Sequence, residues 1–138
     1  MKGKKFATAL NCMDGRVQEP IIKFLKNKYK VDFVDMITEP GIDKIIAEGD
    51  KKILAEIKQK IEISVKKHGS KIITIVGHAD CAGNPVEKEA HLEQIRKGKE
   101  IIRLMNFKVK ILGLWLNEKW KVEIVNSKIK TISKSKRS

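Results

Sequence analysis

The sequence predicts an α/β domain with a mainly parallel sheet of four or five strands flanked by helices. Three observations lead to this prediction. Short apolar runs alternate with longer stretches of helical periodicity, which is the pattern of a parallel sheet. One run, Lys71–Val76, is apolar on both faces, as expected of a central strand covered by helices on both sides. The length of 138 residues fits a single domain.

The first half of the chain is expected to form two strands and two helices. Lys5–Asn11 is a short apolar run that suits a buried strand. A helix is expected to open at Glu19-Pro20, because proline is tolerated in the first turn. Val31–Ile37 is the second predicted strand, and Asp50 is a good N-cap for the second helix. The apolar stripe of that helix repeats every four residues, at Ile53, Ile57, Ile61 and Val65.

The second half supplies the central strand, a third helix and the far edge of the sheet. After Lys71–Val76, a helix is expected over about Val86–Lys97, with Asn84 as its cap. Val109–Leu116 is the fourth predicted strand. A tight turn after it lets Trp120–Val125 pair back as an antiparallel C-terminal edge strand.

The composition narrows the choice of partners. The net charge of +13, from 30 Lys and Arg against 17 Asp and Glu, is compatible with an acidic partner such as nucleic acid. The excess is mostly lysine and is spread along the chain, whereas a dedicated nucleic-acid surface would cluster and would favour arginine and aromatic residues. We therefore do not expect nucleic-acid binding. Residues 126–138 are rich in Ser and Lys and are expected to form a basic C-terminal tail behind a single domain of residues 1–125.

The chain carries no sign of a membrane or export segment. No apolar run approaches the ~20 residues that span a bilayer. The basic start is not followed by a long apolar stretch, so no signal peptide is expected and the cytoplasm is the predicted location. Two cysteines in that compartment are more often free, metal-bound or catalytic than joined in a disulfide.

Two loops carry the residues of a predicted zinc site. His78 and Cys81 lie three residues apart after the central strand, and the only other cysteine, Cys12, follows the first strand. Sites in open parallel sheets form beyond the carboxyl ends of strands, so the three side chains meet if the first and third strands are neighbours. Thiolate and imidazole suit Zn²⁺, and three protein ligands leave one position for water. Ordinary buried thiols and a redox dithiol are the alternatives.

Asp14 and Arg16 lie beside Cys12 and have two possible roles. A catalytic zinc lowers the pKa of its bound water toward about 7, which provides a hydroxide nucleophile at neutral pH. Asp14 could orient that water, with Arg16 keeping the carboxylate ionised through a two-pronged salt bridge. Alternatively, Asp14 could itself be the fourth zinc ligand.

The paired motifs resemble those of the β-class carbonic anhydrases. Cys12-x-Asp14-x-Arg16 and His78-x-x-Cys81 each follow a strand, and the resemblance covers roughly residues 5–125. It implies a β-carbonic-anhydrase-like fold, with Cys12, His78 and Cys81 as zinc ligands and Asp14–Arg16 as a catalytic dyad. It also implies a zinc lyase that converts carbon dioxide to bicarbonate and back by zinc-hydroxide attack.

The chain departs from the pattern of that family in several places. Gly15 stands where the family usually has serine, and the loop Thr38–Gly41 lacks its usual Arg-Asn-Ala-Gly-like stretch. An N-terminal helical arm and the residues that line the carbon dioxide pocket have no obvious equivalent. A non-catalytic zinc-binding protein of the same fold, or a hydrolase of carbonyl sulfide or carbon disulfide, is therefore an alternative. A basic nucleic-acid-binding domain is a remoter one.

The remaining histidines and the tryptophans have plainer interpretations. His68 and His91 are expected on helix surfaces. Trp115 and Trp120 are expected to pack or to line an interface. The apolar edge strand invites pairing with another chain, so a homodimer or a higher homo-oligomer is expected.

Overall fold

Five strands form one sheet in the computed structural model, which describes residues 3–126. Their order across the sheet is β2-β1-β3-β4-β5; β1 to β4 run parallel, and β5 pairs antiparallel with β4. The predicted fold class, with its antiparallel edge strand, is confirmed. Nearly all of the predicted basic tail lies outside the described residues. The strands are β1 (Phe6–Asn11), β2 (Phe33–Thr38), β3 (Ile72–His78), β4 (Lys110–Leu116) and β5 (Val122–Ile124).

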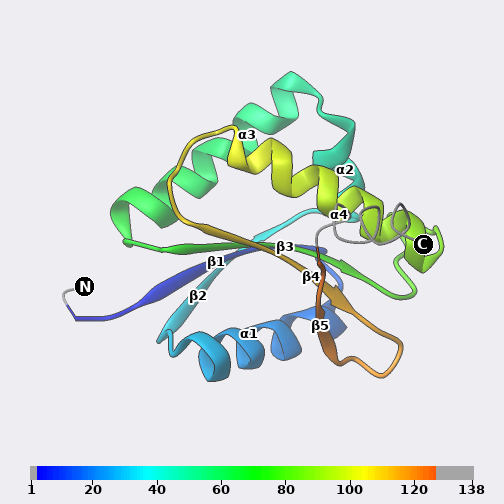
Figure 1. Ribbon diagram of the computed structural model, residues 1–138, viewed down its shortest axis with the longest axis horizontal. Coiled ribbons are helices and arrows are strands. Elements are labelled where there is room, and N and C mark those ends of the chain that lie inside the picture. Colours follow the sequence, from blue (N-terminus) through cyan, green and yellow to red (C-terminus); the bar gives the residue numbers. More distant parts are fainter. Residues whose placement is uncertain (1–2, 127–138) are drawn as a thin grey trace, which may run out of the picture.

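Helices cover both faces of the sheet (Figure 1). One face carries α1 (Gly15–Tyr29), and the other carries α2 (Ile42–Glu48), α3 (Lys51–Glu62) and α4 (Lys88–Arg103). A π-helical turn, η1 (Ile63–Lys67), continues α3. Within residues 3–126, no helix is both long enough and apolar enough to cross a membrane.

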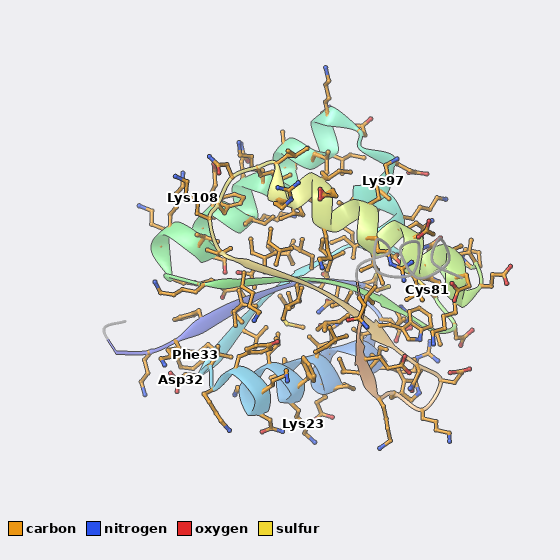
Figure 2. The ribbon with its side chains drawn as sticks, viewed as in Figure 1. Lys23, Asp32, Phe33, Cys81, Lys97 and Lys108 are labelled. Atoms are coloured by element: carbon orange, nitrogen blue, oxygen red, sulfur yellow. The ribbon has the colours of Figure 1, made fainter. Side chains whose placement is uncertain are left out.

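The core is divided between the two faces of β3, in which every residue is buried. Successive side chains of a strand point to opposite faces. Ile72 and Val76 accordingly join the cluster under α1, whereas Ile73 and Ile75 join the cluster under α2, α3 and α4. Aliphatic side chains fill the space between the sheet and its helices (Figure 2). Burial on both faces is what the apolar character of this run predicted.

Two helices begin at other residues than the sequence predicted. α1 opens at Gly15 because Asp14 caps it by accepting the Arg16 N–H at 2.9 Å, so Pro20 lies inside the helix. α4 opens only at Lys88, because the Asn84 side chain bonds elsewhere and does not cap it. α4 also continues beyond Lys97 to Arg103.

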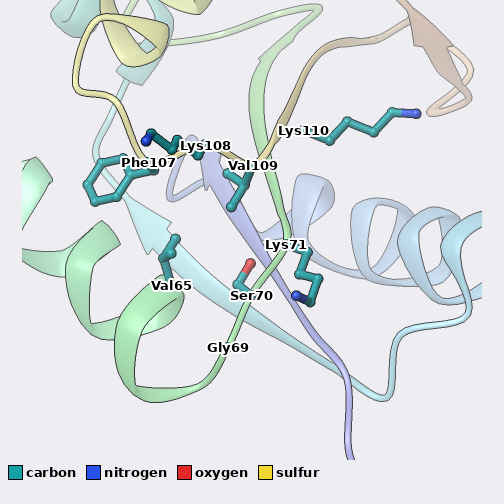
Figure 3. Close-up of a pocket in the computed structure, with 8 residues that line it drawn as sticks. All are labelled: Val65, Gly69, Ser70, Lys71, Phe107, Lys108, Val109 and Lys110. Carbon is teal, nitrogen blue, oxygen red and sulfur yellow. The ribbon is translucent and has the colours of Figure 1, made fainter.

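A cavity of about 440 Å³ lies at the amino-terminal ends of β3 and β4 (Figure 3). The carboxyl ends of these strands are at the opposite edge of the sheet, so this cavity is separate from the two cysteine loops. Its lining is Val65, Gly69, Ser70, Lys71, Phe107, Lys108, Val109 and Lys110.

Asp50 is confirmed as the N-cap of α3, since its Oδ1 accepts the N–H groups of Lys52 and Ile53 at 3.0 Å each. Asp50→Ala leaves both groups without this partner and is expected to lower the free energy of unfolding by about 1 kcal/mol. Urea unfolding followed by circular dichroism measures the change. Lys51→Ala, one residue along, is the control and should change the midpoint little. Equal midpoints for the two variants would contradict the capping role.

Candidate metal centre

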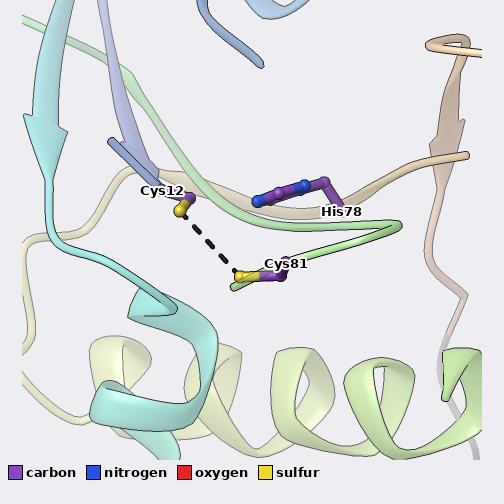
Figure 4. Close-up of side chains that lie close together, drawn as sticks. All are labelled: Cys12, His78 and Cys81. Carbon is purple, nitrogen blue, oxygen red and sulfur yellow. Dashed lines mark hydrogen bonds between the residues drawn. The ribbon is translucent and has the colours of Figure 1, made fainter. Parts of the chain in front are cut away.

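The three predicted ligand residues converge at the carboxyl edge of the sheet (Figure 4). Cys12 follows β1, His78 is the last residue of β3, and Cys81 lies in the loop after it. The strand ends meet there because β1 pairs directly with β3 in parallel. All three residues are buried, and their ligand atoms lie within 4.8 Å of one another.

The sulfur spacing and the orientation of His78 both fit Zn²⁺. The Cys12 and Cys81 Sγ atoms are 3.9 Å apart; two thiolates at about 2.3 Å from a tetrahedral zinc would be separated by about 3.8 Å. His78 Nδ1 lies 2.8 Å from the Ala79 carbonyl oxygen, which can only accept, so in the neutral imidazole Nδ1 carries the proton and Nε2 has a free lone pair. Nε2 is buried with no partner among the described residues. A metal ion would satisfy it.

The surroundings of the two sulfur atoms change the pKa of the Cys81 thiol in opposing directions. Burial raises the pKa of the Cys81 thiol to about 11, and the neighbouring Cys12 sulfur adds to this effect. Hydrogen bonds from the backbone N–H groups of Gly83 and Asn84 lower this pKa. The Gly41 N–H donates to Cys12 Sγ at 3.5 Å. A divalent metal deprotonates the thiols that bind it, so a bound ion would remove the cost of two adjacent buried thiolates.

Arg16 engages both oxygens of the Asp14 carboxylate. Asp14 Oδ1 accepts from the Arg16 backbone N–H at 2.9 Å and from Nε at 3.0 Å, and Oδ2 accepts from a terminal nitrogen at 2.6 Å. These bonds hold the pKa of Asp14 at about 2, below its ordinary value of 3.8, and the carboxylate in turn raises the pKa of Arg16. Among residues 3–126, the cluster able to hold a metal consists of the two cysteines and His78 and does not include Asp14.

Arg16 also connects the loop of Cys12 to the loop of His78 and Cys81. Its guanidinium donates to Asp80 Oδ2 at 3.1 Å and to the Asp80 carbonyl oxygen at 3.2 Å. The guanidinium carbon lies 4.6 Å from the centre of the Trp120 ring, within the range of a cation–π contact. Trp120 lies in the β4–β5 turn and has a left-handed backbone conformation (φ 60°). Its backbone N–H donates to the Asn117 carbonyl oxygen at 2.8 Å. Packing was predicted for Trp120; its contact with Arg16 was not.

A second group of buried polar side chains lies behind the Cys81 loop. Asp43 accepts from His91 Nδ1 at 2.6 Å and from Asn84 Nδ2 at 3.1 Å. All three residues are at most 2% exposed. The prediction that His91 lies on a helix surface is therefore wrong, whereas His68 is indeed exposed, with its Nδ1 2.7 Å from Asp35.

The spacing of the sequence contained a signal for the burial of His91. The buried positions of α4 are His91, Ile95, Gly98 and Ile102, so the histidine continues the apolar stripe by one turn. Asp43 and Asn84 had no comparable signal, because acidic and amide residues next to turns are usually caps.

The sequence matches a known family, and the fold resembles that of solved structures. The profile of a family described as "Putative carbonic anhydrase" matches residues 2–126. No curated protein matches the sequence. Among solved structures, a carbonic anhydrase from Glaciozyma antarctica has a TM-score of 0.57 at 14% identity, covering 86% of this chain and 81% of its own.

Two further solved structures have the same fold. A tetrameric β-carbonic anhydrase from Sordaria macrospora has a TM-score of 0.54 at 13% identity, covering 91% of this chain and 83% of its own. The β-carbonic anhydrase CafA of Aspergillus fumigatus has a TM-score of 0.50 at 13% identity, covering 96% and 82%. The family match extends over most of the sequence, and the chain belongs to this carbonic anhydrase family.

The Arg16–Asp14 contact predicts a measurable titration. Arg16→Gln removes the guanidinium and should raise the pKa of Asp14 from about 2 toward 3.8. The wild-type carboxylate then stays ionised until the pH falls to about 2, whereas the variant takes up its proton at higher pH. A carbon NMR titration of the aspartate carboxyl groups measures both values. Arg103→Gln, which disrupts an exposed pair with Glu100, is the control. An unchanged Asp14 titration in Arg16→Gln would show that the guanidinium does not set this pKa.

Proposed function

We propose that the chain is a zinc-dependent carbonic anhydrase that interconverts carbon dioxide and bicarbonate. The observation that carries the proposal is the convergence of two thiols and a buried imidazole nitrogen, beside a carboxylate that Arg16 binds through both oxygens. Three ligands with an open position are typical of catalytic rather than structural zinc sites. Membership of the family supports the same assignment.

Different residues of the site would bind the ion and orient the nucleophile. Cys12, His78 and Cys81 would hold the ion, and zinc, when bound, supplies an acidified water as the nucleophile near neutral pH. Asp14 stays an acceptor at neutral pH because its pKa is about 2. A lone pair of Asp14 not used by Arg16 can therefore receive the nucleophile's O–H and orient it. Direct ligation by Asp14 has less support, because the cluster able to hold a metal among residues 3–126 does not include its carboxylate.

We also propose that the chain forms a homodimer or a higher homo-oligomer in the cytoplasm. Within the described part of the chain, the sheet ends in β2 on one side and β5 on the other. These edges carry exposed apolar side chains at Phe33 and Ile124. The similar β-carbonic anhydrases of Sordaria macrospora are tetramers, which supports an assembly of this kind. Both cysteines are free, which suits a reducing compartment.

A basic nucleic-acid-binding domain receives less support. Lys23, Lys97 and Lys108 project from different sides of the molecule (Figure 2), so these charges do not gather on one face. Carbonyl sulfide and carbon disulfide remain alternative substrates for the same centre, because both are small linear electrophiles like carbon dioxide.

The proposal predicts bound zinc together with hydration activity. Protein purified without added metal should contain about one zinc per chain and lose it in Cys81→Ala. Stopped-flow measurement of carbon dioxide hydration should show catalysis, reduced about 100-fold in Asp14→Asn without loss of zinc. Glu100→Gln, at an exposed ion pair, is the control. Zinc-loaded wild type that does not accelerate hydration would favour the non-catalytic alternative, and a chain without zinc would overturn the metal centre.

A further inference from the structure

The two cysteine loops are held against a third segment, the turn that begins α2. Gly41, the N-cap of α2, donates its N–H to Cys12 Sγ at 3.5 Å. The same residue touches the Cys81 loop backbone to backbone: a Cβ on Gly41 would lie 2.7 Å from the Gly83 carbonyl oxygen, and a Cβ on Gly83 would lie 2.9 Å from the Gly41 nitrogen. The start of α2 therefore contacts both sulfur-bearing loops.

Asp43, two residues further on, links this turn to the other ligand-bearing segments. Its Oδ1 accepts from Asn84 Nδ2 at 3.1 Å, and the Asn84 backbone N–H closes the Cys81 turn by donating to the Cys81 carbonyl at 3.2 Å. Its Oδ2 occupies the space of a missing side chain at Gly77, where a Cβ would lie only 2.6 Å away. Gly77 immediately precedes His78. The carboxylate is thus in contact with the segments that carry His78 and Cys81.

The donors around Asp43 leave little freedom of arrangement. The Asn84 amide has two N–H bonds, which the Asp43 carboxylate and Gln94 Oε1 (2.7 Å) accept. His91 Nδ1, 2.6 Å from Asp43 Oδ2, must then be the donor in that pair, because a carboxylate only accepts. The Asn84 side chain is consequently fixed by α2 on one side and by α4 on the other.

Stability alone does not account for this network. A buried acid–base pair is often no better for stability than apolar residues of the same shape. His91 Nε2 is also buried without a partner in the described part of the chain, which adds a cost. The network contacts Gly77, which precedes His78, and the turn that contains Cys81, so a change in the network would change the spacing of the predicted ligand residues.

We propose that Asp43, through Asn84 and His91, is a positioning residue that holds the Cys12 and Cys81 loops at the separation a tetrahedral metal requires. The inference rests on the proposed metal centre. It assigns the network a role in metal affinity rather than in contact with the substrate. Residues that orient metal ligands from behind typically contribute 10–100-fold to metal affinity.

The test compares two substitutions, each of which removes a buried polar side chain, at opposite ends of the sheet. Asn84→Ala removes the bond to Asp43 but leaves that carboxylate its bond from His91. Ser64→Ala is the matched control: Ser64 is equally buried and bonds to Thr8 and Asp35, each at 2.6 Å, beside the other end of β1. Binding of Co²⁺ and Zn²⁺ is measured by competition with a chromophoric chelator, and the thiolate-to-cobalt absorption band is recorded, alongside urea unfolding of each protein without metal.

Asn84→Ala is expected to weaken metal binding by about 10–100-fold and to shift the cobalt band, whereas Ser64→Ala should leave both close to wild type at a similar loss of stability. Unchanged affinity and band in folded Asn84→Ala would overturn the positioning role. If that variant does not fold, His91→Gln supplies the measurement: weaker cobalt binding supports the role, and wild-type binding overturns it. Wild type that binds no cobalt would overturn the metal centre together with this inference. Altered cobalt binding without carbon dioxide hydration would leave the inference standing and reject only the proposed activity.

Discussion

The parallel pairing of β1 with β3 is the constraint on which the site depends. Parallel neighbours end at the same edge of a sheet, so Cys12 after β1 and His78 at the end of β3 come together although they are far apart in sequence. β3 lies between β1 and β4 under helices on both faces, and its isoleucine and valine side chains suit this burial. The composition of the central strand therefore fixes the place where the ligands can meet.

Two groups of hydrogen-bonded polar residues lie on either side of the site, one exposed to solvent and one buried. Toward solvent, Arg16 binds Asp14 and Asp80 under the Trp120 ring, where water screens the charges. Toward the core, Asp43 and His91 are almost completely buried. The low dielectric there strengthens each hydrogen bond and makes any broken one costly. Under the proposed function, the exposed contacts suit a carboxylate that meets substrate, and the buried contacts suit loops that keep a fixed spacing.

The strands, the helices and the cluster of Cys and His residues could be predicted from the sequence, because each depends on a local pattern. Strand and helix periodicities predicted the sheet, and the Cys and His spacing predicted that Cys12, His78 and Cys81 converge, as the structure shows. The sequence prediction that α1 opens at Glu19-Pro20 is wrong, because Asp14 caps the helix and Pro20 lies inside it. The links from Asp43 to Asn84 and from Arg16 to Trp120 join residues distant in sequence. Single-sequence patterns contain no information about such pairs.

Cys12 and Cys81 are separated by 69 positions along the chain, yet their sulfur atoms are neighbours. An ion shared by them would act as a removable cross-link that closes a long loop. It would bind the folded chain far better than the unfolded one, and the folded population would increase with free metal concentration. Supply of the ion would then govern how long the chain survives proteolysis as well as whether it can react.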